Sequence, residues 1–367
     1  MKYRQYLVIL AIVVAVHLVF LLILRGGCKG GEKSTVDNPS NSSENVLEPT
    51  PGPVEENVPE VVNDEPAQAV VASQNSDPLE GVIPFSAQFF RRNLVALPPN
   101  VQKLTDNCKS GIVVDLDNNC ILWEKDAYTA RPMASVTKIM TALVAVRKMR
   151  LSNGIVTPDT KIQVTRTASK IGGRQVWLDP RESFTFTEIL KCIMVHSAND
   201  CAHLMAEFMG NGDVDSFVSE MNMQAKSLGC NNFHFVNPHG LTADDGTENS
   251  GSPIELAYLA SVVLRVPEIT KWSNVKVEYI RENDDAFKMR NKGQATMLSS
   301  SNSLLGRCNG VNGLKTGFTN KAGFCIVITC ERNSRRVAVV IMGSPKAKVR
   351  DELGIALVNW AYATINK

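Results

Sequence analysis

The sequence predicts an α+β fold, in which an antiparallel sheet is flanked by helices and accompanied by a helical subregion. Two segments with the pattern of β-hairpins, 110–126 and 322–344, lie near opposite ends of the globular part of the chain. The segments between them have the apolar spacing of helices. We therefore expect one sheet that both ends of the chain complete, with helices packed against it.

Both hairpins are recognised by a turn between two apolar runs. In "SGIVVDLDNNCILWEKD" the runs flank the turn residues Asp117, Asn118 and Asn119. In "AGFCIVITCERNSRRVAVVIMGS" residues 331–335 occupy the turn. Each segment therefore predicts two antiparallel strands joined by a short connection.

Helices are expected in four segments of the globular part. Residues 136–149 have helical spacing, and Thr185 and Glu188 have the spacing of a capping box before "ILKCIMVHSAND". Pro253 begins "PIELAYLASVVLR", at a position that proline favours in helices. The segment "VRDELGIALVNWAYATI" directly follows the last strand and predicts the closing helix.

The N-terminal zone, residues 1–28, predicts a membrane anchor. Its apolar run from Leu7 to Leu24 would span roughly 27 Å as a helix, enough to cross a bilayer core. No small-residue cleavage site follows Leu24, so an uncleaved anchor is favoured over a removed signal peptide. Cys28, just beyond the apolar run, offers lipidation as an alternative.

The remaining chain divides into a tether and one globular domain. Residues 29–84 hold nearly half of the 17 prolines and are acidic, which predicts a disordered, extended tether. Residues 85–367 are expected to form a single domain, which is basic although the whole chain carries a net charge of only +2. No zinc-finger spacing, RNP pattern or coiled-coil heptad accompanies that charge, so we expect no nucleic-acid partner.

Cysteine and histidine patterns do not predict a metal site. The nine cysteines form no C-x-x-C pair, and their odd number argues against a complete disulfide framework. His196, Cys201 and His203 are close in sequence, but no H-E-x-x-H or comparable pattern accompanies them. We therefore expect neither a metal nor another cofactor.

Ser135 and Lys138, in "MASVTKIMTALVAV", form the first candidate catalytic pair. A serine at a helix start lies near amide groups that stabilise negative charge, and a lysine one turn later lies on the same face. To act as a base, Lys138 needs a pKa lowered by roughly three units, about 4 kcal/mol, which burial and the charge of Lys315 would favour. A capping serine with a surface lysine is the alternative, and Ser273 and Lys276 have the same spacing.

Two further motifs follow in order along the chain. "HSAND" contains Ser197, which could relay a proton to a leaving amine, and Asn199, whose amide could hold a substrate carbonyl. "VNGLKTGFTNKAG" contains Lys315 and Thr316, which offer a charge and a hydroxyl to a carboxylate, and Gly317, which would let a substrate lie along the strand edge. The alternative for "HSAND" is an ordinary turn at the end of a helix. The alternative for "VNGLKTGFTNKAG" is an ordinary edge strand without a binding role.

The trio "SVTK", "SAN" and "KTG" resembles the serine-type D-alanyl-D-alanine carboxypeptidases, low-molecular-mass penicillin-binding proteins that share a fold with serine β-lactamases. "NPHGL", from Asn237 to Leu241, also resembles a signature of that family. The resemblance implies a β-lactamase/transpeptidase-like fold, a serine acyl-enzyme without a cofactor, and inhibition by β-lactams. It further implies that the amides of Ser135 and Phe318 form an oxyanion hole. Arg350 would bind the substrate carboxylate, with a solvated helix face as the alternative for this residue.

The resemblance implies that the domain trims the terminal D-alanine from peptidoglycan stem peptides, outside the bacterial cytoplasmic membrane that holds its anchor. A D,D-endopeptidase that cuts cross-links is the alternative. This sequence has no β-rich segment after its closing helix, and family members without such a domain include endopeptidases. A β-lactamase is less favoured, because "FHFVNPHGL" stands where that class has a glutamate. An intact Lys138 and Ser197 argue against a non-catalytic wall-binding or antibiotic-sensing module.

Overall fold

The structure is a computed structural model that describes residues 76–282, 287 and 294–366. The expected anchor at residues 1–28, with Cys28, and the expected tether up to residue 75 lie outside the described residues. Within the described ranges, no helix combines the length and the apolar character needed to cross a membrane. The anchor and residues 29–75 of the tether therefore stay predictions. Residues 76–84, which were also expected to belong to the tether, instead pack on the domain: Arg147 donates to Asp77, and Leu79 and Val82 lie against the core.

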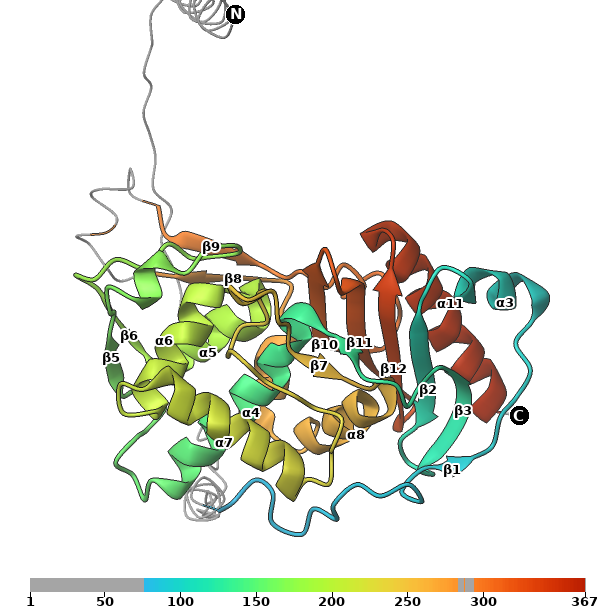
Figure 1. Cartoon of the computed structure of the whole chain (residues 1–367). Helices are drawn as coiled ribbons and strands as arrows, with labels where there is room; N and C mark the ends of the chain where they lie inside the picture. Colours follow the sequence, from blue (N-terminus) through green and yellow to red (C-terminus); the bar gives the residue numbers. More distant parts are fainter. Residues whose placement is uncertain (1–75, 283–286, 288–293, 367) are drawn as a thin grey trace, which may run out of the picture. The chain divides into compact units, whose positions relative to one another are not determined.

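A six-stranded sheet forms the centre of the described domain (Figure 1). All neighbouring strands pair antiparallel except β1, which runs parallel to β3. The strands, in sheet order, are β1 (Arg91–Arg92), β3 (Cys120–Lys125), β2 (Ser110–Asp115), β12 (Arg335–Ser344), β11 (Gly323–Arg332) and β10 (Val311–Thr319). The two predicted hairpins are therefore confirmed, and the strand that carries the "KTG" motif is an edge strand.

The turn of the second hairpin is shorter than the expected 331–335. Only Asn333 and Ser334 connect the strands, and Arg332 still pairs with Arg335. Both connecting residues have positive φ angles, 50° and 58°. Because this type I′ geometry follows the natural twist of paired strands, two residues are enough to reverse the chain.

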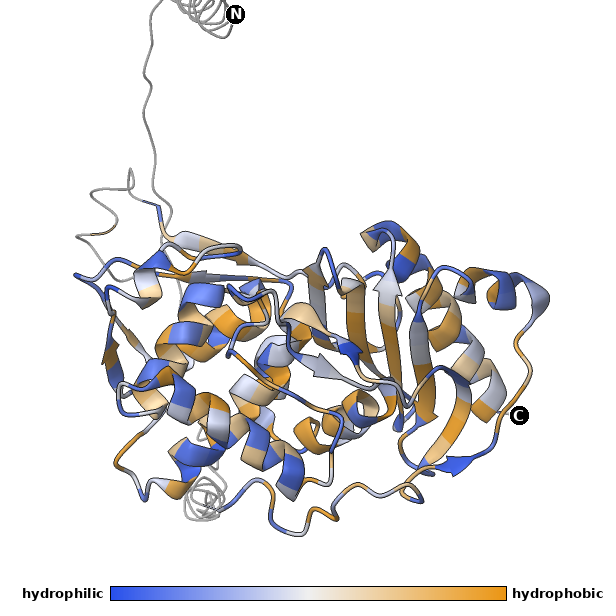
Figure 2. Ribbon diagram, in the orientation of Figure 1, coloured by the Kyte–Doolittle hydropathy of each residue, from blue (hydrophilic) through white to orange (hydrophobic). Residues whose placement is uncertain are grey.

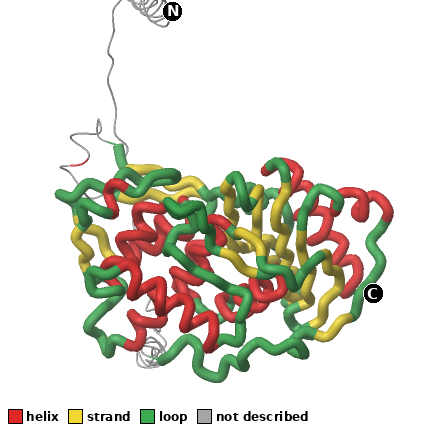
Figure 3. Tube along the Cα trace, in the orientation of Figure 1, coloured by secondary structure: helices red, strands yellow, loops and turns green. Residues whose placement is uncertain are grey.

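Helices cover both faces of the sheet. The closing helix α11 (Ala347–Ile365) and the short α3 (Pro99–Thr105) lie on one face, and α8 (Pro253–Val263) lies on the other (Figures 1 and 3). Successive strand residues alternate between these faces, so that Val339 packs with the α11 side and Val340 with the α8 side. Figure 2 shows the resulting concentration of apolar residues along the central strands.

The predicted helical subregion lies beside the edge strand β10 (Figure 1). Its α-helices are α4 (Lys138–Leu151), α5 (Phe186–Lys191), α6 (Asn199–Met209), α7 (Val214–Ser227) and α9 (Pro267–Ser273). Short strand pairs surround it: β4 (Arg131–Pro132) with β7 (Ser250–Gly251), β5 (Lys161–Gln163) with β6 (Ser183–Thr185), and β8 (Val277–Ile280) with β9 (Thr296–Ser299). The capping box of Thr185 and Glu188 is present, and Pro253 occupies the first turn of α8, as predicted.

Candidate active site

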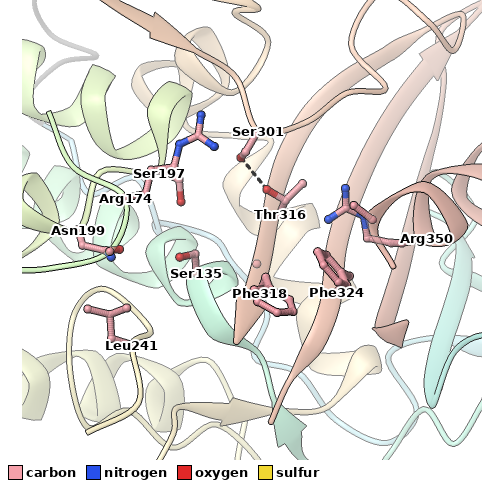
Figure 4. A pocket seen from close by; sticks show the side chains of 13 residues that line it. Ser135, Arg174, Ser197, Asn199, Leu241, Ser301, Thr316, Phe318, Phe324 and Arg350 are labelled. Atoms are coloured by element: carbon pink, nitrogen blue, oxygen red, sulfur yellow. Dashed lines mark hydrogen bonds between the residues drawn. The ribbon is translucent and has the colours of Figure 1, made fainter. Parts of the chain in front are cut away.

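A cleft of about 380 Å³ lies between β10 and the helical subregion (Figure 4). The structure brings all nine predicted site residues to this cleft. Seven of them line it: Ser135, Ser197, Asn199, Thr316, Gly317, Phe318 and Arg350. Lys138 and Lys315 lie behind the surface, where each contacts one of the lining serines.

Ser135 lies in a 3-10 turn, Ala134–Thr137, that leads directly into α4. Asn249 holds both ends of this turn: its carbonyl accepts from the Met133 amide at 3.0 Å, and its side-chain amide donates to Thr137 Oγ1 at 2.9 Å. The predicted helical segment 136–149 therefore lies within this 3-10 turn and α4, and the α-helix itself begins two residues later than expected, at Lys138. The serine hydroxyl is fixed at the start of a helix and open to the cleft.

Two glycines allow the backbone to approach this turn closely. A Cβ atom at Gly317 would lie 2.9 Å from the Ser135 amide nitrogen and 2.7 Å from the Met133 carbonyl oxygen. A Cβ at Gly240, within the "NPHGL" segment, would lie 2.1 Å from the Ala134 carbonyl oxygen, and its φ of +84° also favours glycine. Strand β10 and the "NPHGL" loop thus contact the serine turn from two sides.

Lys138 is fully buried and contacts three oxygen atoms. Its Nζ lies 3.0 Å from Ser135 Oγ, 2.6 Å from Asn199 Oδ1 and 2.6 Å from the carbonyl oxygen of His239. The last two are carbonyl oxygens, which only accept hydrogen bonds. A neutral amine therefore directs both N–H groups to them and its lone pair to the serine hydroxyl, the orientation that a general base requires.

Burial and neighbouring charges favour this neutral form. Burial, followed by the positive charge of Lys315, holds the pKa of Lys138 well below its usual value. Burial also lowers the pKa of Lys315 to about 7, with further contributions from the cations of Arg174 and Arg350. Burial and the charge of Lys315 are the two causes that the sequence predicted for a lowered pKa of Lys138.

Ser197 occupies a strained position at the end of a π-helix, Cys192–His196. Its φ of 64° lies in the left-handed region, which is uncommon outside glycine. The hydroxyl accepts a hydrogen bond from Lys315 Nζ at 2.8 Å. Ser197 was predicted to end a helix, and it does. The hydrogen bond from Lys315 also links the "SAN" motif directly to the "KTG" motif.

Asn199 is arranged differently from the sequence expectation. Its Oδ1 accepts from Lys138, and its Nδ2 donates to the Gly172 carbonyl at 2.9 Å. Because that carbonyl only accepts, the orientation of the amide group is fixed. Asn199 lines the cleft, but in this structure its side chain holds Lys138 instead of pointing both groups at a substrate.

The rim of the cleft near β10 is polar at one end and aromatic at the other. Thr316 Oγ1 donates to Ser301 Oγ at 2.6 Å (Figure 4). The ring of Phe318 stacks on Phe324 with centroids 4.2 Å apart, and the Phe318 residue is 51% exposed. A substrate lying along β10 would thus contact hydroxyl groups at one end of the rim and the aromatic pair at the other.

Arg350, in the first turn of α11, is only 4% exposed, so it does not belong to a solvated helix face. Its Nε and Nη2 both donate to Asp351 Oδ1, at 2.9 and 2.6 Å, and its Nη1 donates to the Cys325 carbonyl at 3.3 Å. The guanidinium reaches the cleft as expected. Its charge is already balanced by the adjacent carboxylate, which the sequence analysis did not predict.

Sequence analysis missed one wall of the cleft, the loop that carries Gly173 and Arg174. This loop is fixed by the residues after Ser197: the Arg174 carbonyl accepts from the Asn199 amide, and Asp200 accepts from the amides of Val176 and Leu178. The loop has no periodic pattern, so only the charge of Arg174 beside two glycines could have drawn attention to it.

The residues considered for a metal have other surroundings. Cys201 is buried, and His203 Nε2 lies 3.6 Å from Glu207 Oε1. In the part of the chain that the structure describes, no group of three or more His, Cys, Asp and Glu side chains is placed to hold a metal ion. The eight cysteines in that part are all free and buried.

Comparison with known proteins identifies related sequences. Residues 99–346 match the family Peptidase_S11, described as D-alanyl-D-alanine carboxypeptidase. The D-alanyl-D-alanine carboxypeptidase DacF of Bacillus subtilis is 31% identical over 71% of this chain and 64% of its own length. The D-alanyl-D-alanine endopeptidase of Escherichia coli is 28% identical over 71% of this chain and 78% of its own length. This chain thus spans slightly less than two thirds of the Bacillus relative.

Solved structures agree with the predicted fold. The penicillin-binding protein D2 of Listeria monocytogenes, solved in an ampicillin-bound form, superimposes with a TM-score of 0.59 at 26% identity. The match covers 69% of this chain and 96% of the Listeria chain. The β-lactamase/transpeptidase-like α+β fold expected from the sequence is therefore confirmed.

Proposed function

This chain belongs to the Peptidase_S11 family of D-alanyl-D-alanine carboxypeptidases, and we propose that it removes the terminal D-alanine from peptidoglycan stem peptides. Ser135 forms the acyl-enzyme. The observation that carries this proposal is the position of Lys138 Nζ, 3.0 Å from Ser135 Oγ and held by two carbonyl acceptors. A buried lysine in this arrangement has the geometry and the lowered pKa of a general base.

The reaction proceeds in two steps. Lys138 takes the proton of Ser135 as Oγ attacks the carbonyl between the two D-alanines, and the amides of Ser135 and Phe318 stabilise the oxyanion. The C–N bond then breaks, and Ser197 passes a proton to the leaving amine, replenished through Lys315 at 2.8 Å. Before hydrolysis, Lys138 gives up its proton to solvent and Lys315 regains one, so both amines return to their starting forms. Water then attacks the ester carbonyl, Lys138 accepts the proton from water, and this proton passes to Ser135 Oγ as the C–O bond breaks.

Cleavage of cross-links is a second candidate function. The Escherichia coli endopeptidase is matched over 78% of its length, against 64% for the Bacillus carboxypeptidase. Both reactions break a bond to a D-alanine carbonyl, so the same Ser135, Lys138 and Ser197 serve either one. The two differ only in what occupies the leaving-group end of the cleft.

β-Lactams are proposed as inhibitors that acylate Ser135, which the ampicillin-bound Listeria relative supports.

We also propose that the apolar run from Leu7 to Leu24 anchors the protein in the bacterial cytoplasmic membrane with the domain outside. The basic character of the domain suits an anionic cell wall. Fusions of residues 1–84 to a reporter that is active only outside the membrane and to one that is active only in the cytoplasm test this orientation; activity of the cytoplasmic reporter alone would contradict it.

Incubation of the purified protein with a stem pentapeptide and with a cross-linked muropeptide dimer tests the activity. The proposal expects release of D-alanine from the pentapeptide at a higher kcat/KM than release of monomer from the dimer. The Ser135→Ala variant provides the control and is expected to release neither product. Faster cleavage of the dimer would favour the endopeptidase, and no turnover of either by a folded protein would refute both.

A further inference from the structure

Arg174 is a charged group of the cleft that the reaction described above does not use. It comes from the loop on the side of the cleft opposite β10 and α11, and it lines the same cavity as Thr316 and Arg350. Figure 4 shows its guanidinium above Ser197 and facing Ser301. The one hydrogen bond that its side chain makes to the described residues runs from Nη2 to the Ser299 carbonyl at 2.9 Å.

No carboxylate forms an ion pair with Arg174 among residues 76–282, 287 and 294–366. Among the residues that the structure describes, no aspartate or glutamate lines the cavity. Burial lowers the pKa of Arg174, in keeping with a partly desolvated cation. Arg174 is exposed at the rim of the cleft, so an anion that enters the cleft can reach its guanidinium directly.

The other two cations at this end of the cleft are less available to an anion. Arg350 is balanced by Asp351, which accepts from both its Nε and its Nη2. Lys315 is 1% exposed, is directed to Ser197 Oγ, and has a pKa of about 7, so it is partly neutral near neutral pH. Arg174 therefore provides the uncompensated positive charge that a substrate anion would meet.

The hydroxyl groups between the two arginines complete a site for a carboxylate. Ser301 Oγ and Thr316 Oγ1 are hydrogen-bonded to each other at 2.6 Å and lie between Arg174 and Arg350 in Figure 4. Both arginines line the same cavity, and both contribute to the lowered pKa of Lys315 behind it. A planar guanidinium offers paired N–H donors, which suit a carboxylate.

We propose that Arg174 is a specificity-determining residue that binds the free carboxylate of the leaving D-amino acid from the side of the cleft opposite Arg350. This assignment rests on the proposed peptidase function. It implies that the enzyme selects substrates whose leaving group ends in, or carries, a carboxylate next to the departing nitrogen. A leaving group in which that carboxylate is amidated loses the contact.

Two acetylated tripeptides that end in D-Ala-D-Ala, one with a free carboxylate and one with a C-terminal carboxamide, test this role. The Arg174→Gln variant is expected to lower kcat/KM for the carboxylate peptide about 10- to 100-fold, as for a lost hydrogen bond between charged groups. The loss should be in KM, because the carboxylate is bound in the ground state and the transition state alike. The carboxamide peptide should be unaffected, and Arg174→Lys should restore part of the loss.

Arg166→Gln is the matched control, because Arg166 is exposed and does not line the cleft; neither peptide should change. An equal loss for both peptides in Arg174→Gln, or no loss for either, would overturn the assignment. Should the wild type turn over neither peptide, the peptidase proposal fails by itself. Equilibrium binding of both peptides to Ser135→Ala, with and without Arg174→Gln, then decides the role of Arg174. If Arg174 binds the carboxylate, the carboxylate peptide binds more tightly than the carboxamide peptide, and Arg174→Gln removes the difference. If the two peptides bind equally well, or if Arg174→Gln leaves the difference unchanged, the assignment is refuted.

Discussion

Lys138 Nζ lies 2.6 Å from Asn199 Oδ1, and this contact sets the direction of the bond between the lysine and Ser135. The Asn199 amide is held in turn by the Gly172 carbonyl. Since two carbonyl oxygens occupy the donors of a neutral Lys138, its lone pair faces the serine hydroxyl. Asn199, in the "SAN" motif, thus acts on Ser135, in the "SVTK" motif, by orienting the neutral amine of Lys138.

Asn199→Asp should move the acidic limb of the activity profile to higher pH. A carboxylate beside Nζ favours the charged lysine, so the pKa of Lys138 should rise by roughly 1–3 units. The neutral base then forms only at higher pH, and penicillin acylation near pH 7 should fall about tenfold or more. The second-order rate of acylation, measured from pH 5 to 10, checks this.

Asn199→Ala is the control for that experiment, because it removes the acceptor without adding a charge. It should lower the rate without an upward shift of the limb. A limb at the same pH in wild type and Asn199→Asp would show that Lys138 is not the titrating base.

Gly317→Ala should separate β10 from the serine turn. The new Cβ would lie 2.7 Å from the Met133 carbonyl and 2.9 Å from the Ser135 amide, so the strand edge must shift. Because misplacement by about 1 Å typically costs on the order of 100-fold, acylation should fall by about that factor.

Gly172→Ala is the matched control, because no atom of the described residues lies within 4 Å of its added Cβ, so the backbone carbonyl that holds Asn199 can stay in place. It should acylate at close to the wild-type rate. Equal rates for the two variants, with similar melting temperatures, would show that contact between β10 and the serine turn does not matter.

Lys315→Met should change how stability depends on pH. The folded pKa of Lys315 is about 7, whereas an unfolded lysine titrates near 10.4, so between these values the unfolded chain binds a proton that the folded chain lacks. The depressed pKa therefore makes wild-type stability rise with pH above about 7, by up to about 1.4 kcal/mol per pH unit, and fall as pH drops towards 7.

Urea denaturation of both proteins at pH 7, 8 and 9 checks this. The free energy of unfolding of the wild type should increase relative to Lys315→Met by about 2–3 kcal/mol between pH 7 and 9. A constant difference between the two proteins would mean that Lys315 keeps an ordinary pKa in the folded state.

The fold was predictable where local rules and tertiary packing agree. Thr185 and Glu188 form the expected capping box, and the "KTG" strand lies at the sheet edge. The turn at Asn333 and Ser334 was estimated too long, because turn residues of low hydrophobicity continue into paired strands there. Period and composition do not report where a ladder of hydrogen bonds ends.

The candidate site was predictable in its members more than in its contacts. Motif order indicated that Ser135, Ser197 and Lys315 would share one site; Ser135 and Ser197 line the same cleft, and Lys315 contacts Ser197. The pairing of Arg350 with Asp351 follows from side-chain packing around α11, and Arg174 comes from a loop without a pattern. Contacts of this kind depend on three-dimensional neighbours that spacing along the chain does not encode.

The most direct test of the account is the mass and position of the adduct formed with penicillin. Wild-type protein treated with penicillin and digested should carry one equivalent of the intact drug, on the peptide that contains Ser135. The Ser135→Ala variant should carry none and should still unfold cooperatively. An adduct on a different residue, or one that persists in Ser135→Ala, would contradict the assignment of Ser135 as the nucleophile and of Lys138 as its base.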